Sequence, residues 1–130
     1  MDDNRFAAAP PVEVQDCIAA CTELERISED CAAACLRLDG DDDVTDCFLA
    51  DLDCVEVCAA TNRLLGWRSR TDGPTTQAML QACREAASVS IAACERMLRD
   101  RPDWHSCVPA AHRAFAACTA LLAAYEPDAV

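Results

Sequence analysis

The sequence contains no lysine, so its eleven basic residues are all arginines, set against 23 acidic residues. The formal net charge of −12, without a basic stripe, argues against nucleic acid as a partner. No stretch approaches the ~20 apolar residues of a membrane span, and the N-terminus MDDNRFAAAPP lacks the apolar run of a signal peptide. We therefore expect a cytoplasmic protein with no nucleic-acid and no membrane partner.

Turn-forming and aromatic residues are also scarce. The chain has 3 glycines and 6 prolines, and aromatic residues make up 5% of it. This composition favours long helices with short loops over a many-stranded sheet. At 130 residues the chain is long enough for one domain with a core and too short for two comfortable ones.

We expect a flexible N-terminal arm over residues 1–12 and a four-helix bundle over residues 13–126. The sequence DGDDD at 39–43 separates the first two helices, with Asp43 as the N-cap of the second, and Gly66 and Arg101-Pro102 end the second and third. The predicted helices cover residues 13–38, 44–65, 74–100 and 103–125. Their lengths and short loops predict an all-α, antiparallel up-down-up-down bundle.

Cysteine is abundant: there are eleven, an odd number that cannot all pair within one chain. Each predicted helix has one seam of positions in alternating steps of three and four, the rhythm of a bundle core. All eleven cysteines fall on these seams. They are Cys17, Cys21, Cys31, Cys35, Cys47, Cys54, Cys58, Cys83, Cys94, Cys107 and Cys118.

Three readings compete with a soft-metal site. Cysteine can act as a small buried hydrophobe, but this explains one or two positions rather than eleven. Disulfides between helices stay open, whereas a bridge four residues along one helix would have to span ~5–6 Å between β-carbons that prefer ~3.8 Å. Zinc with four thiolates would leave a net charge of −2 in a dry core.

Monovalent copper suits the seams better than zinc. Thiolates are the soft ligands that Cu(I) prefers, and one bridging thiolate per ion gives a nearly neutral cluster. Met97, on the third seam, is a soft candidate ligand, and His105 is a second candidate outside the cysteines. Asp51 also lies on a seam, but a carboxylate is a hard ligand, so we assign it a structural or capping role.

At this point the sequence resembles the cytosolic branch of the cysteine-rich four-helix-bundle copper storage proteins. The resemblance covers about residues 17–124 and rests on four motifs: the first-helix pattern of CxxxC pairs in CIAACTELERISEDCAAAC, CFLADLDCVEVCAAT at 47–61, MLQAC at 79–83 and CTALLAA at 118–124. It implies a bundle interior lined by thiolates that holds many Cu(I) ions, in a homo-oligomer that is a dimer or a tetramer.

The sequence departs from this family at seven positions that usually carry cysteine, and at the usual histidines. Met97 stands where a histidine usually follows the third-helix cysteines, and the histidines of the entrance map near Arg101 and Asp103, which leaves His105 as a substitute. The seven replaced cysteines correspond to Leu24, Ser28, Ala87, Ser90, Trp104, Ala111 and Ala114.

A rise of ~1.5 Å per residue along antiparallel helices sorts the thiols by height. Most of the replaced positions fall in the middle, with Cys54 between two groups that lie toward opposite ends. The first group is Cys31, Cys35, Cys47, Cys94 and Cys107, and the second is Cys17, Cys21, Cys58, Cys83 and Cys118. This predicts two separate copper sites divided by an apolar plug, with copper entering near Trp104 and passing Met97 and His105.

The preferred interpretation is a Cu(I)-binding and storage protein of reduced capacity, which works by binding and has no catalytic residue. One alternative is a copper-thiolate enzyme derived from the storage fold, although Asp51 and His105 are the only candidate bases near the seams. The other is a metal-free structural bundle with disulfides.

Overall fold

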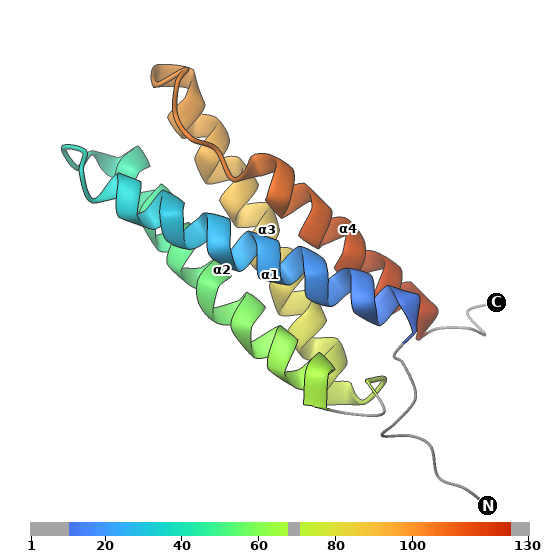
Figure 1. Cartoon of the computed structure of the whole chain (residues 1–130). Coiled ribbons are helices and arrows are strands. Elements are labelled where there is room, and N and C mark those ends of the chain that lie inside the picture. Colours follow the sequence, from blue (N-terminus) through green and yellow to red (C-terminus); the bar gives the residue numbers. More distant parts are fainter. Residues whose placement is uncertain (1–10, 68–70, 126–130) are drawn as a thin grey trace, which may run out of the picture.

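A computed structural model of the chain describes residues 11–67 and 71–125 and contains four helices there (Figure 1). They are α1 (Val12–Cys35), α2 (Asp42–Trp67), α3 (Pro74–Asp100) and α4 (Val108–Ala124). Each helix packs against two neighbours, in the cycle α1, α2, α3, α4 and back to α1. The predicted all-α bundle is confirmed. Residues 1–10 of the expected arm over 1–12 lie outside the described residues, and so does residue 126 of the expected bundle domain.

The two ends of the bundle carry different connections (Figure 1). The link between α1 and α2 and the link between α3 and α4 lie at one end, which we call the Asp41 end. The end of α2, the start of α3 and the last turn of α4 lie at the other, the Tyr125 end. In the part of the chain that the structure describes, none of the helices has the length and apolar character needed to cross a bilayer.

The start of α2 is fixed by an aspartate other than the one predicted. The backbone N–H of Val44 donates to Asp41 Oδ1 at 2.9 Å, which is the side-chain contact that defines an N-cap. The prediction of Asp43 as the cap is therefore wrong. Asp42 and Asp43 instead occupy the first turn, where negative charge is favourable beside the unpaired N–H groups.

The fourth helix is shorter than predicted. It begins at Val108, not at residue 103, and carries Pro109 in its first turn. In a helix that began at 103, Pro109 would lie in the interior, where it lacks an N–H and its ring clashes with the preceding turn. Residues 101–107 form an irregular connection instead, so Trp104 does not lie on a helix.

The core follows the predicted seams and divides in two along the bundle axis. One cluster of buried side chains surrounds Cys21 and Cys83 and continues through the middle of the bundle to Ala110. The other surrounds Cys47 and Cys94 at the Asp41 end. The small side chains of cysteine, alanine and serine at most seam positions let the four helices approach one another closely.

Candidate metal centre

All eleven cysteines are buried free thiols, and none exposes more than 2% of its surface. The prediction that every cysteine faces the core is confirmed. Ten of them come from the helical seams, whereas Cys107 enters from the residue just before α4. Helix α1 supplies four of the thiols, α2 three, α3 two and α4 one.

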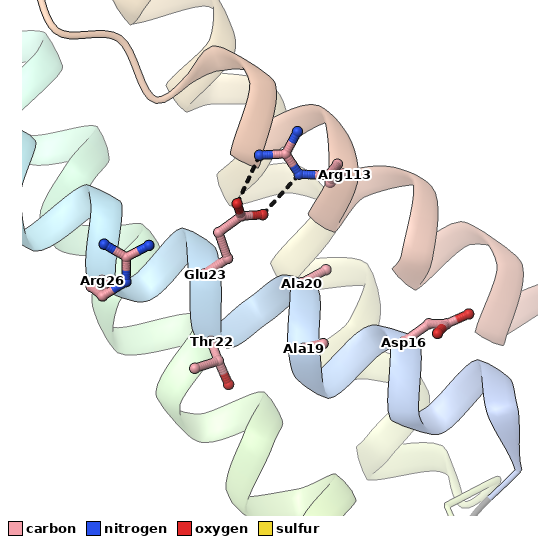
Figure 2. A pocket seen from close by; sticks show the side chains of 7 residues that line it. All are labelled: Asp16, Ala19, Ala20, Thr22, Glu23, Arg26 and Arg113. Atoms are coloured by element: carbon pink, nitrogen blue, oxygen red, sulfur yellow. Dashed lines mark hydrogen bonds and ion pairs between the residues drawn. The ribbon is translucent and has the colours of Figure 1, made fainter.

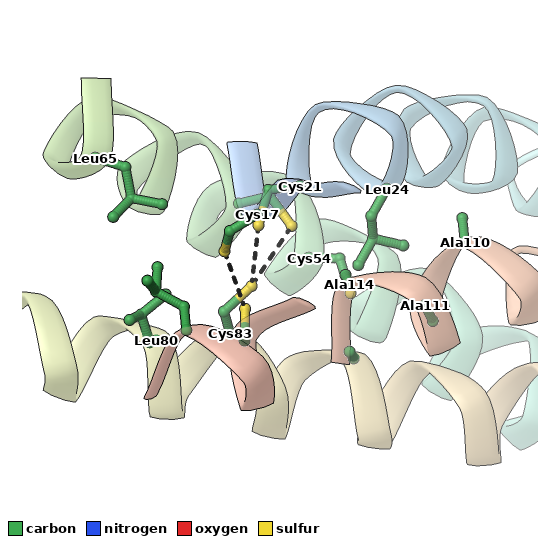
Figure 3. Close-up of a cluster of buried hydrophobic side chains, with 14 of the residues drawn as sticks. Cys17, Cys21, Leu24, Cys54, Leu65, Leu80, Cys83, Ala110, Ala111 and Ala114 are labelled. Carbon is green, nitrogen blue, oxygen red and sulfur yellow. Dashed lines mark hydrogen bonds between the residues drawn. The ribbon is translucent and has the colours of Figure 1, made fainter. Parts of the chain in front are cut away.

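Five thiols meet near the Tyr125 end, and we call them the Cys83 group (Figure 3). Cys83 Sγ lies 3.6 Å from Cys21 Sγ and 4.0 Å from Cys58 Sγ. Cys17 Sγ lies 3.6 Å from Cys118 Sγ. All four helices contribute to this group. Two sets of three sulfurs, which share Cys21, have all their members within 4.8 Å of one another, close enough to hold one ion.

Five more thiols meet at the Asp41 end and form the Cys94 group. Cys47 Sγ lies 4.0 Å from Cys31 Sγ and 3.9 Å from Cys94 Sγ. Cys94 and Cys107 are the closest pair, with 3.0 Å between their sulfurs. Cys35 completes the group, in a set with Cys31 and Cys47. The two groups have the membership that the heights predicted.

Asp51 belongs to the Cys94 group, which was not predicted from the sequence. Its side chain is fully buried, and its two carboxylate oxygens accept contacts from Cys47 Sγ at 3.8 Å and from Cys107 Sγ at 3.7 Å. Burial raises the pKa of Asp51 to about 7. Its place on the seam, four residues after Cys47, was the available signal. The hardness of a carboxylate as a ligand favoured a structural role over membership of a soft-metal site.

The segment between the two groups is lined mainly by small or apolar side chains. Figure 3 shows Leu24 and the α4 alanines on one side of the Cys83 group, with Leu65 and Leu80 on the other. Cys54 lies apart from both groups, and its thiol donates to the carbonyl of Ala86 at 3.5 Å. Six of the seven positions without the usual cysteine are fully buried here: Leu24, Ser28, Ala87, Ser90, Ala111 and Ala114.

This middle segment is less apolar than predicted, because two of its residues are serines. Ser90 Oγ lies 3.1 Å from Cys107 Sγ and so borders the Cys94 group. Ser28 Oγ is buried without a hydrogen-bond partner among the described residues. The two hydroxyls are compatible with the separation of the groups, since a neutral hydroxyl is a weak ligand for a soft ion.

Neighbouring thiols shift the acidity of individual cysteines. Contacts from Cys118 and Cys21 lower the pKa of Cys17 to about 5, and contacts from Cys31 and Cys94 lower the pKa of Cys47 to about 6. Cys54 lacks such support, and burial raises its pKa to about 12. Each group therefore contains a thiol that is ionised at neutral pH, which is the form that binds metal.

The two remaining predicted ligands lie in different settings at the Asp41 end. Met97 is fully buried and packs in the same cluster as Cys47 and Cys94. His105 is exposed on the connection before α4. Among the described residues, no set of potential metal ligands includes His105. Its role as a ligand stays a prediction, and so does that of Met97.

A shallow groove between α1 and α4 is separate from the thiols (Figure 2). It contains the ion pair in which Arg113 Nε and Nη2 each donate to a carboxylate oxygen of Glu23 at 2.8 Å. None of the residues that line this groove is a cysteine. They are Asp16, Ala19, Ala20, Thr22, Glu23, Arg26 and Arg113.

Comparison with known proteins finds a matching family and solved structures of similar fold. A family model described as copper storage protein matches residues 11–123. Among solved structures, a mutant of Ccsp from Streptomyces lividans with two histidines replaced by alanine is 32% identical, with a TM-score of 0.77 over 85% of this chain and 93% of that chain. No curated protein matches the chain.

Two further structures come from the same organism. One, titled as copper loading to a cytosolic copper storage protein (five coppers), is 32% identical with a TM-score of 0.77, and covers 85% of this chain and 92% of that one. The other, titled as Ccsp loaded with 10 copper equivalents, is 29% identical with a TM-score of 0.76, and covers 92% of this chain and 96% of that one.

Proposed function

The chain belongs to the copper storage protein family, and from this premise we propose that it binds and stores Cu(I) in the cytosol through the thiolates of its buried cysteines. The observation that carries the proposal is the gathering of ten free, buried thiols into two groups, in which neighbouring sulfurs lie 3.0–4.0 Å apart and Cys35 lies within 4.8 Å of Cys31 and Cys47. Thiolates at these distances are soft ligands that a two- or three-coordinate Cu(I) ion can bridge without large movements of the helices.

The charge balance favours Cu(I) over a divalent ion. One thiolate per Cu(I) is neutral, so many ions can enter an apolar interior, whereas Zn²⁺ held by four thiolates leaves two uncompensated negative charges. On this count the capacity is at most about one ion per thiol, eleven for the chain. The capacity is lower than that of a bundle with cysteine along the whole seam, because six seam positions in the middle of this bundle carry no thiol.

We further propose that copper forms two separate clusters. The Cys83 group and the Cys94 group supply five thiols each, and the segment around Leu24, Ser28 and Ala87 offers no soft ligand between them except Cys54. Asp51 adds carboxylate oxygens to the Cys94 group, so the two clusters differ in chemistry. Met97 and His105 are proposed as further ligands on the Asp41 side.

A titration of the reduced protein with Cu(I) against a chromophoric chelator, without oxygen, tests storage directly. We expect several ions per chain; binding of one ion or none would contradict the proposal. Native mass spectrometry of the same samples reports the metal, the stoichiometry, any disulfides and whether the protein is the proposed dimer or tetramer.

Paired variants test the two clusters. Cys17→Ser with Cys118→Ser removes one close pair from the Cys83 group, and Cys94→Ser with Cys107→Ser removes one from the Cys94 group. We expect each double variant to lose copper from its own end in crystals of the loaded protein, while the other end stays filled. Copper spread evenly along the axis in the unsubstituted protein would contradict two separate clusters.

A further inference from the structure

Arg101 makes two contacts at the Asp41 end that join the surface to the thiol core. Its Nη1 donates to the sulfur of Met97 at 3.7 Å, and its Nη2 donates to Asp41 Oδ2 at 3.1 Å. Met97 lies one helical turn after Cys94 on the buried face of α3, and Arg101 is the residue just after the helix, whose side chain reaches back to the Met97 sulfur. The guanidinium is therefore the outermost member of a row that leads inward to Cys94.

The exposure of these side chains decreases in the same order. The side chain of Asp41 is 57% exposed and that of Arg101 is 28% exposed, whereas Met97 is fully buried. The backbone of Arg101 is held, because its N–H donates to the Met97 carbonyl at 2.9 Å and its carbonyl accepts from the Trp104 N–H at 2.9 Å. The side chain of Arg101 is held less firmly than its backbone. Its partner Asp41 is largely exposed to solvent, so the ion pair can open and let the guanidinium move away.

The guanidinium and a Cu(I) ion compete for the same thioether. An N–H donor on the sulfur occupies one of its two lone pairs, and a fixed positive charge beside it repels an incoming cation. Asp41 offsets part of that charge and also holds the guanidinium over the sulfur. Met97 is thus a soft ligand next to the Cys94 group that is covered as long as Arg101 stays paired with Asp41.

We propose that Arg101 controls the entry of copper at the Asp41 end by covering the Met97 sulfur, and that copper reaches the Cys94 group through Met97 when the Arg101 side chain moves away. This inference rests on the proposed storage function and concerns the rate of loading, not its extent. An exposed ion pair of this kind is weak enough to open readily, so it slows entry without blocking it.

Stopped-flow loading of the reduced protein from a Cu(I)-chelator complex tests the proposal. We expect Arg101→Ala to speed the first phase roughly two- to fivefold, the factor that a surface ion pair of this kind is worth. Asp41→Asn should act in the same direction, because asparagine keeps the N-cap of α2 while removing the charge that holds the guanidinium. Both variants should bind as much copper in total as the unsubstituted protein.

Two further variants separate entry through Met97 from a general change of charge. Met97→Leu keeps the side-chain volume but removes the sulfur, so it should slow loading and cancel the gain when combined with Arg101→Ala. Arg63→Ala removes one positive charge from the exposed side of α2 toward the Tyr125 end, away from Arg101, and should leave the rate unchanged.

The results distinguish this proposal from the storage function. Equal first-phase rates in the Arg101→Ala, Asp41→Asn and unsubstituted proteins, with full copper binding in all three, would overturn the role of Arg101 and leave storage intact. An equal increase in the Arg63→Ala protein would also overturn it, because charge alone would then be the cause. An unsubstituted protein that binds no copper would overturn both proposals.

Discussion

Replacing Asp51 with asparagine should change how the stability of the metal-free, reduced protein depends on pH. Asp51 is fully buried and its pKa is about 7, whereas an exposed aspartate has a pKa of ~3.9. Between these values the unfolded chain loses the proton and the native protein keeps it. The native state therefore binds more protons, and the free energy of unfolding falls as pH rises.

The size of this effect follows from the two pKa values. Each pH unit between them costs ~1.4 kcal/mol, so the loss attributable to Asp51 reaches roughly 4 kcal/mol near pH 7 and is constant above it. Cys17 and Cys47 act in the opposite direction, because their lowered pKa values let the native protein lose a proton before the unfolded chain does. The unsubstituted protein alone therefore shows only the sum of these effects.

The difference between the two proteins reports the Asp51 charge together with its effect on Cys47, whose pKa that charge raises, and both effects favour the variant as pH rises. Urea unfolding of the unsubstituted and Asp51→Asn proteins, followed by circular dichroism from pH 4 to pH 8, gives two curves of unfolding free energy. Asparagine gains or loses buried contacts by an amount independent of pH, so only the change of the difference with pH is diagnostic. We expect the variant to gain by a few kcal/mol relative to the unsubstituted protein over this range. Parallel curves would refute the reasoning.

Two other predictions use the core and the thiols. Leu24→Ala should lower the free energy of unfolding, measured in urea, by roughly 2–5 kcal/mol, because Leu24 is fully buried between the thiol groups. The control Leu49→Ala, at a side chain that is 52% exposed, should change it by less than about 0.5 kcal/mol. Similar losses in both variants would contradict this prediction. Ultraviolet thiolate absorbance of the metal-free protein should increase between pH 4 and pH 7, and Cys17→Ser with Cys47→Ser should reduce that increase; contacts from Cys118 and Cys21 also lower the pKa of Cys83, which can account for the thiolate that remains. Cys54→Ser is the matched control, since the pKa of Cys54 is raised to about 12, and it should leave this titration unchanged.

The sequence was sufficient to predict the bundle and the membership of the thiol groups. Helical periodicity decides which face is buried, and an antiparallel arrangement with a fixed rise per residue decides which positions share a height. These rules placed Cys31 with Cys94 and Cys17 with Cys118. They also placed Cys54 between the groups, where the structure has it.

Three features could not be obtained in this way, each for a physical reason. The start of α4 is set by Pro109, whereas the seam periodicity continues back to Trp104 and so predicts a longer helix. The position of Asp51 was visible on the seam, but its contact with Cys107 comes from the connection before α4, whose path the periodicity does not define. The contact of Arg101 with Met97 depends on the rotamer of a long side chain, which Asp41 on another connection selects.

The ion pair between Glu23 and Arg113 marks the same helix alignment that brings two thiols together. Cys17 precedes Glu23 on α1 by about as many residues as Cys118 follows Arg113 on α4, so in antiparallel helices the two pairs share one axial alignment. The two-pronged ion pair forms only at this alignment of α1 and α4, and sliding by one helical turn, ~5.4 Å, would break it and separate sulfurs that now lie 3.6 Å apart. A charged contact on the surface and a pair of thiols in the core therefore depend on the same placement of the first helix against the last, and that placement determines which thiols can share an ion.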